Sequence, residues 1–145
     1  MADFVFFYGT LMTPFNRPGR QRVDSKMGFV SRGRIHAALF DLGIYPAAVP
    51  TSDDGVVWGE VYEVHDVSAV LTALDEIEGY RSSEPETSLY TRVLVDVTVE
   101  DGRAVSAWAY FYNAPLGRAE RIASGDYLEH LNLRPPVSDA RTQPS

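Results

Sequence analysis

Alternation of apolar with polar positions marks much of this chain as β-strand. Residues 56–64, 90–99 and 105–112 each follow the two-residue period of a strand, in which successive side chains point to opposite faces. The dipeptide Asp101-Gly102 between the last two segments is a hairpin turn signal. Residues 29–40 mix glycine with β-favouring residues, which predicts a long or bulged strand.

Two further apolar segments are short. Residues 4–8 form an aromatic and aliphatic run that is typical of a buried strand. Residues 44–49 are an extended piece that contains Pro46, and proline cannot donate a hydrogen bond to a sheet. We therefore expect this second piece at a sheet edge or at the rim of a barrel.

A helical period replaces the strand period at mid-chain. Asp66 or Ser68 can cap a helix that runs to about Glu78, and Gly79 marks its end. A second, short helix is expected over residues 126–131. Strands still outnumber helices, which favours an α+β fold with a curved, largely antiparallel sheet that closes toward a barrel.

The mid-chain helix carries an acid on its apolar side. At about 100° per residue, its aliphatic residues fall in one sector and Glu78 falls at the margin of that sector. Asp75 lies at the edge and Glu76 on the opposite side, so both are expected to be solvated or bonded to nearby backbone. Burial and the helix dipole would raise the pKa of Glu78 and suit it to proton transfer near neutral pH. The alternative is a helix that frays at Gly79 and releases Glu78 into solvent.

The first apolar run ends abruptly at Gly9 and Thr10. A glycine permits a sharp turn, after which consecutive backbone N–H groups can face outward and hold an anion or a developing oxyanion. An ordinary strand end with a glycine turn is the alternative. The loop that follows contains Arg17, Arg20 and Arg22, which form either a solvated surface cluster or a clamp for a substrate carboxylate.

Composition narrows the class of protein. With 145 residues the chain fits one domain, which we place at residues 1–133, followed by a proline-containing flexible tail at 134–145. The net charge of −7 argues against a nucleic-acid or anionic-membrane partner. The absence of cysteine excludes a disulfide, a thiolate nucleophile and a cysteine-bound metal. No secretory leader and no membrane-spanning apolar run is found, so a cytoplasmic protein is the simplest interpretation.

Metal and hydrolase chemistry have little support. The three histidines, His36, His65 and His130, are scattered in sequence, and we expect surface or structural roles for them. No nucleophile-elbow motif is present, so a Ser-His-Asp hydrolase is unsupported. We expect neither a metal nor a cofactor.

Three ordered motifs resemble one known family. Tyr8-Gly9-Thr10-Leu11, then residues 74–79 (Leu-Asp-Glu-Ile-Glu-Gly), then Tyr90-Thr91-Arg92 are similar in order and spacing to the gamma-glutamylcyclotransferase-like family, of the γ-glutamylamine cyclotransferase type. The resemblance runs from about residue 4 to residue 128. It implies a small mixed, mostly antiparallel β-barrel with flanking helices and a pocket at one end.

The resemblance also implies a reaction and its residues. Family members let the α-amine of a γ-glutamyl amine or dipeptide attack its own γ-carbonyl, which gives 5-oxoproline and a free amine. The family's acid–base glutamate matches Glu78. Its substrate-binding positions match Tyr8, Gly9, Thr10, Leu11, Gly43, Tyr45, Pro46 and Tyr90. Arg92 is either a ligand or a structural partner, and we favour the second.

The sequence departs from the family at two places. The loop after Leu11 lacks the compact Gly-x-x-Asn-His pattern, and the polar, acidic segment 81–88 lies where it can reshape the pocket mouth. Both leave the amine portion of the substrate open. The partner is thus expected to be a small γ-glutamyl molecule, with a homodimer left open as the oligomeric state.

One alternative of another class stays open. A protein on the same fold can bind a small anionic metabolite without catalysing a reaction. Retention of Glu78 favours the enzyme, because a carboxylate beside an anion weakens its binding. A narrower version of the enzyme hypothesis assigns it to a biosynthetic pathway, where it removes a γ-glutamyl protecting group.

Overall fold

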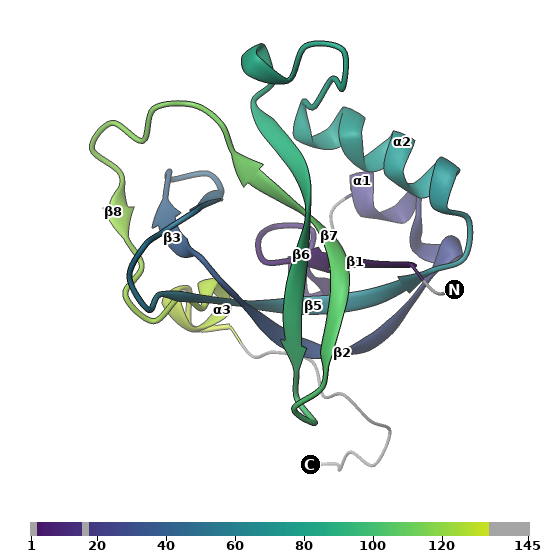
Figure 1. Ribbon diagram of the computed structural model, residues 1–145, viewed down its shortest axis with the longest axis horizontal. Coiled ribbons are helices and arrows are strands. Elements are labelled where there is room, and N and C mark those ends of the chain that lie inside the picture. The colour runs from purple at the N-terminus through teal and green to yellow at the C-terminus, as the bar shows by residue number, and fades with distance from the viewer. Residues whose placement is uncertain (1–2, 16–17, 134–145) are drawn as a thin grey trace.

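The computed structural model describes residues 3–15 and 18–133. The domain predicted for residues 1–133 is thus described almost throughout, and the tail predicted for residues 134–145 lies outside the described residues. Figure 1 shows strands crossing at the centre, helix α2 on one side of them and a small second sheet on the other.

A closed five-stranded barrel forms the centre of the molecule. Its strands, in order around the barrel, are β1 (Asp3–Phe7), β5 (Val56–Val64), β2 (Met27–His36), β6 (Tyr90–Val99) and β7 (Ala104–Tyr112). Neighbours pair antiparallel except β1 and β7, which run parallel and pair at Val5 and Trp108. The predicted α+β fold with a mostly antiparallel barrel is confirmed.

Small and β-branched side chains fill the barrel. The strands that alternate in sequence turn one face inward, and the fully buried members are Val5, Val57, Val61, Val97, Ala107 and Ala109. Burial of these methyl groups drives closure of the sheet. The predicted strands at residues 56–64 and 90–99 have the observed bounds of β5 and β6, and Gly102, with a φ of 94°, forms the turn before β7.

The long strand predicted for residues 29–40 is divided in two. The expected bulge lies between Phe29 and Ser31 of β2, but β2 ends at His36. The Ala37 N–H donates to the Gly55 carbonyl, and the chain then enters a separate sheet as β3 (Ala38–Asp41). That sheet has the order β4 (Pro46–Val49), β3, β8 (Glu120–Arg121), so the prediction of Pro46 at a sheet edge is confirmed.

Helix α2 (Val67–Glu78) is the long helix that the periodicity predicts. Asp66, not Ser68, caps its start by accepting a hydrogen bond from the Ala69 N–H at 3.2 Å. Gly79 ends it in the left-handed conformation, with a φ of 68° that disfavours other residues. The short helix expected at residues 126–131 is α3 (Tyr127–His130), capped by Asp126.

The remaining helical turns are short. They are η1 (Thr13–Phe15), α1 (Pro18–Gln21), η2 (Asp24–Lys26) and η3 (Pro85–Thr87). The first three lie in the loop between β1 and β2, and η3 lies in the polar segment after α2. That segment returns to its starting point, because the Leu89 N–H donates to the Gly79 carbonyl at 3.0 Å. Within the described part of the chain, no helix has the length and apolar character needed to cross a membrane.

Candidate active site

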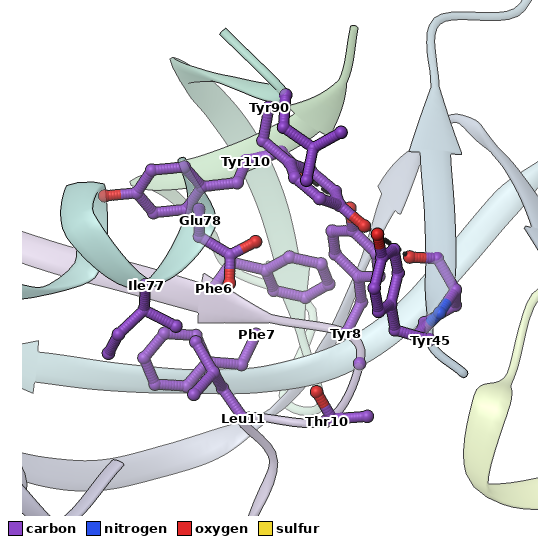
Figure 2. A pocket seen from close by; sticks show the side chains of 13 residues that line it. Phe6, Phe7, Tyr8, Thr10, Leu11, Tyr45, Ile77, Glu78, Tyr90 and Tyr110 are labelled. Carbon is purple, nitrogen blue, oxygen red and sulfur yellow. Dashed lines mark hydrogen bonds between the residues drawn. The ribbon is translucent and has the colours of Figure 1, made fainter. Parts of the chain in front are cut away.

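A hollow of about 610 Å³, open mouth included, lies between the end of β1 and the end of α2. Figure 2 shows aromatic rings on several sides and one carboxylate among them. The lining residues are Phe6, Phe7, Tyr8, Gly9, Thr10, Leu11, Tyr45, Pro46, Ile77, Glu78, Leu89, Tyr90 and Tyr110.

Glu78 comes from the last turn of α2. Val70 and Leu74 bury the helix against the barrel, and this packing turns the half-buried Glu78 toward the hollow while Glu76 remains exposed. The carboxylate points into the hollow in Figure 2. The helix periodicity therefore predicted the position of Glu78 correctly, and the alternative of a carboxylate released into solvent is wrong.

The wall opposite Glu78 is the turn that follows β1, which we call the main-chain wall. Gly9, Thr10 and Leu11 line the hollow, and the Met12 N–H donates to the Gly9 carbonyl at 3.0 Å to close a tight turn. Gly9 is not among the glycines with positive φ, so our conformational reason for a glycine was wrong. A Cβ at position 9 would lie 2.9 Å from Pro46 Cγ, so the close approach of Pro46 requires the glycine.

Two buried tyrosines tie the hollow to the second sheet. The Tyr8 hydroxyl donates to the Tyr110 carbonyl at 2.6 Å and accepts from the Ala48 N–H at 3.3 Å. The Tyr90 hydroxyl donates to the Pro46 carbonyl at 3.0 Å. The predicted substrate-binding tyrosines Tyr8 and Tyr90 thus reach the hollow, and their hydroxyls also hold strands together.

Tyr45 completes this aromatic wall. Its ring centroid lies 6.1 Å from that of Tyr90. Both Tyr45 and Pro46 line the hollow, whereas Gly43, predicted beside them, does not. Gly43 lies in an exposed turn with a φ of 101°, where its N–H donates to Asp41, and it borders a second, more open depression. The exposed turn, closed by the Asp41 side chain, therefore holds Gly43 outside the hollow, whereas Tyr45, next to β4, still reaches it.

Asp75, one turn before Glu78, is more constrained than predicted. Instead of facing solvent or bonding only to backbone, it accepts a hydrogen bond from the Tyr110 hydroxyl at 2.6 Å and pairs with Arg92 at 3.1 Å. The Arg92 guanidinium also lies 5.1 Å from the Trp108 ring centroid. The structural role favoured for Arg92 is confirmed, and this group attaches the end of α2 to β6 and β7.

Burial keeps the hollow's phenols neutral. Burial raises the pKa of Tyr8, Tyr90 and Tyr110, and the nearby Glu78 carboxylate raises each pKa further. For Tyr90 the neighbouring Tyr8 adds to the effect, and for Tyr110 the hydrogen bond to Asp75 does so. We call these three residues the pocket tyrosines. A raised pKa favours the neutral phenol, which can donate a hydrogen bond.

A buried polar group that the sequence pattern did not predict lies close to the main-chain wall. Glu60 on β5 is fully buried, and its Oε1 accepts from the Thr13 N–H and hydroxyl, both at 3.0 Å, and from the Tyr62 hydroxyl at 2.8 Å. This carboxylate holds the chain just after Leu11. An acid between the large apolar residues Trp58 and Tyr62 on one face of a strand was the available signal.

The arginine cluster divides between two environments. Arg20 is half-buried, and its Nη1 donates to the Leu11 carbonyl at 2.8 Å, while Arg22 is exposed and pairs with Glu76. Arg17 lies outside the described residues. Within the described part of the chain, no lysine, arginine or histidine lines the hollow. The clamp hypothesis is therefore wrong for Arg20 and Arg22.

The histidines lie at the surface, as expected. His130 pairs with Asp41 at 2.8 Å, and His36 and His65 are exposed. Over residues 3–15 and 18–133, no three His, Cys, Asp or Glu side chains gather in a way that could hold a metal ion.

Comparison with known proteins places the chain in a family. The model of a family described as gamma-glutamyl cyclotransferase, AIG2-like, matches residues 5–129. The chain belongs to this family. The gamma-glutamylcyclotransferase family protein YtfP of Escherichia coli K12 is 35% identical over 91 residues, which cover 63% of this chain and 67% of that protein.

Solved structures from the same family share the fold. The solution structure of protein ytfP from Escherichia coli matches with a TM-score of 0.61 at 29% identity, over 88% of this chain and 97% of that chain. The crystal structure of an AIG2-like protein from Mus musculus matches with a TM-score of 0.64 at 26% identity, over 97% and 99% of the two chains. The segment matched by the gamma-glutamyl cyclotransferase, AIG2-like model contains every residue that lines the hollow.

Proposed function

We propose that this protein is a γ-glutamyl cyclotransferase that releases 5-oxoproline and a free amine from a γ-glutamyl amine or dipeptide. One observation carries the proposal. A single half-buried carboxylate, that of Glu78, points into a small aromatic hollow whose opposite wall is formed by residues 9–11. Family membership supports a cyclotransferase of this general kind, and the substrate and product are our own inference.

The reaction is intramolecular, so positioning supplies much of its rate. The α-amine and the γ-carbonyl belong to one glutamyl chain, and holding that chain folded brings nitrogen and carbon within reach of each other. The rings of Phe6, Tyr8 and Tyr45 border a hollow suited to such a folded chain. Binding there restricts rotation about the bonds of the glutamyl chain and holds it in a conformation close to that of the five-membered ring.

The proposed reaction makes one C–N bond and breaks another. The neutral α-amine attacks the γ-carbonyl carbon, a C–N bond forms, and the carbonyl oxygen becomes an oxyanion. Main-chain N–H groups of the Gly9–Leu11 wall stabilise that charge. The bond to the departing amine then breaks as the carbonyl re-forms, which leaves 5-oxoproline.

Glu78 transfers the proton that this exchange requires. Its carboxylate accepts a proton from the attacking nitrogen and returns it to the leaving nitrogen, so the enzyme ends in its starting state. The raised pKa of the pocket tyrosines disfavours their phenolate form, which leaves Glu78 as the base of the hollow.

The test is turnover with a panel of γ-glutamyl amides and γ-glutamyl dipeptides, read as 5-oxoproline formed. We expect Glu78→Gln to lower kcat at least about 100-fold, the usual contribution of a general acid–base group. Glu76→Gln is the matched control, because it removes a carboxylate from the exposed side of the same helix turn. We expect it to keep wild-type turnover.

Two results would contradict the proposal in different ways. A folded Glu78→Gln variant with full turnover would remove Glu78 from the chemistry. A wild-type protein that binds 5-oxoproline or a γ-glutamyl analogue yet turns over no member of the panel would favour the non-catalytic binding protein.

A further inference from the structure

Arg20 lies behind the main-chain wall of the hollow, outside its lining. Its side chain is only 12% exposed, and its guanidinium carbon lies 4.3 Å from the Tyr62 ring centroid. Nη1 donates to the Leu11 carbonyl at 2.8 Å, and Nε faces Asp24 at 2.8 Å. A charged side chain is thus buried against the rear of the turn that forms the wall.

Two hydrogen bonds in series connect this charge to the peptide unit between Gly9 and Thr10, two residues that line the hollow. The Leu11 carbonyl, which accepts from Arg20, shares a peptide unit with the Met12 N–H. That N–H donates to the Gly9 carbonyl at 3.0 Å, and the Gly9 carbonyl shares a peptide unit with the Thr10 N–H. In a planar trans peptide the carbonyl and the N–H point in opposite directions. Because the Gly9 carbonyl faces Met12 inside the turn, the Thr10 N–H faces away from the turn's interior.

Hydrogen bonds in series polarise one another. A cation at the head of the series draws electron density from the first carbonyl, which strengthens the next N–H as a donor, by roughly 10–30% per bond in condensed-phase estimates. Charge-assisted hydrogen bonds are about twice as strong as neutral ones, so Arg20 begins the series strongly.

We propose that Arg20 is a positioning and polarising residue for the main-chain wall, and that its charge reaches the reacting carbonyl through Leu11, Met12 and the Thr10 N–H. This inference rests on the proposed cyclotransferase function. It gives the wall a positive character without placing a cation in the hollow, where it would pair with Glu78. No atom of Arg20 touches the substrate.

Two side chains of opposite charge form hydrogen bonds with the main chain of residues 11–13. Arg20 holds the Leu11 carbonyl, and two residues later Glu60 holds the Thr13 N–H. The two side chains also meet through Tyr62, whose ring lies against the guanidinium and whose hydroxyl donates to Glu60. Asp24 lies at the far edge of the guanidinium and offsets part of its charge. The turn is therefore held at two points, and Glu60 still holds one of them when Arg20 is replaced.

The experiment compares Arg20→Lys with Arg20→Gln. Lysine keeps the charge, and glutamine keeps an N–H donor without the charge. Removing a complete oxyanion donor lowers kcat about 10²- to 10³-fold, so weakening one donor in Arg20→Gln is expected to lower kcat about tenfold with little change in KM. Arg20→Lys is expected to recover most of that loss. Arg22→Gln, an exposed arginine of the same loop, is the matched control and should behave as wild type.

A spectroscopic measurement separates polarisation from simple structural support. In ¹H–¹⁵N spectra, the amide protons of Met12 and Thr10 should both move upfield in Arg20→Gln and stay near their wild-type positions in Arg20→Lys. Equal kcat losses in the two variants would overturn the proposal. A shifted Met12 resonance beside an unmoved Thr10 would also overturn it.

Failure of this inference is distinct from failure of the proposed function. A wild-type protein that forms no 5-oxoproline contradicts the function, and the amide shifts still decide the polarisation. An active wild-type protein whose Arg20→Gln variant has unchanged kcat contradicts the role of Arg20 alone.

Discussion

Tyr8→Phe tests whether the Tyr8 hydroxyl is structural or catalytic. The residue is 6% exposed, and its hydroxyl serves two main-chain groups, the Tyr110 carbonyl and the Ala48 N–H. Phenylalanine keeps the ring in the wall of the hollow and deletes both hydrogen bonds. The substitution therefore separates the shape of the hollow from the link that Tyr8 makes between β1, β4 and β7.

The expected loss of stability follows from those two bonds. A buried polar group left without a partner costs about 1–3 kcal/mol. The bond to Tyr110 is short at 2.6 Å and the bond from Ala48 is long at 3.3 Å, so the second contributes at the low end. We expect a total of about 2–3 kcal/mol, equivalent to a fall in Tm of about 6–10 °C at this chain length.

Equilibrium unfolding in urea measures this value. With an m-value of about 2 kcal/mol/M, the midpoint should fall by about 1 M while m stays constant. Tyr112→Phe is the control, because Tyr112 is half-buried beside Tyr90 and its hydroxyl makes no hydrogen bond within the described residues. We expect it to change the stability by less than about 0.5 kcal/mol, as is usual away from such features.

Turnover of the same variant completes the test. A hydroxyl that only links strands leaves kcat within about tenfold of wild type, whereas a proton-transferring group costs at least about 100-fold. Unfolding free energy equal to wild type, or a 100-fold fall in kcat, would refute the structural role.

Three other predictions concern the same region. Gly9→Ala should cost about 1–3 kcal/mol by overpacking, because its Cβ would lie 2.9 Å from Pro46 Cγ, and differential scanning calorimetry would show this as a lower Tm. Asp75→Asn should cost about 1–3 kcal/mol in urea unfolding, since it removes the charge that holds Arg92 and Tyr110; an unchanged midpoint would contradict the attachment of α2 by this group. Stability should fall as pH rises above about 10, because tyrosines ionise there in the unfolded chain while the pocket tyrosines, with raised pKa, stay protonated in the folded one. Urea midpoints at pH 9 and pH 11, with absorbance at 295 nm to count phenolates, would check the last point, and native titration of all eight tyrosines near pH 10 would contradict it.

The periodicity of apolar residues predicted helices and strands well where the buried face of the element follows that periodicity. The helix with Asp66 at its start and Gly79 at its end, and the strands β5 and β6, follow directly from apolar spacing and capping chemistry. The same spacing located Glu78. The division of residues 29–40 was not predictable in this way, because the break at Ala37 depends on a partner carbonyl at Gly55 that only the tertiary fold supplies.

Side-chain contacts between residues that are far apart in the sequence could not be predicted from it. Glu60 lies on the face of β5 that also carries Trp58 and Tyr62, and its partner Thr13 in η1 reaches it only after folding. Asp75 looked like a surface acid until β6 and β7 brought Arg92 and Tyr110 to it. Arg20 belonged to a basic loop with no periodicity to guide it. In each case the deciding contact joins residues far apart in the chain.

The hydrogen bond from the Leu89 N–H to the Gly79 carbonyl closes residues 80–88 into a loop. This loop leaves the barrel and returns to it beside the hydrogen bond between Gly79 and Leu89. Glu78 directly precedes the loop and Tyr90 directly follows it. Substitutions at the mostly exposed residues 81–87 can therefore change what approaches the entrance of the hollow, while α2, β6 and the contacts between them stay in place.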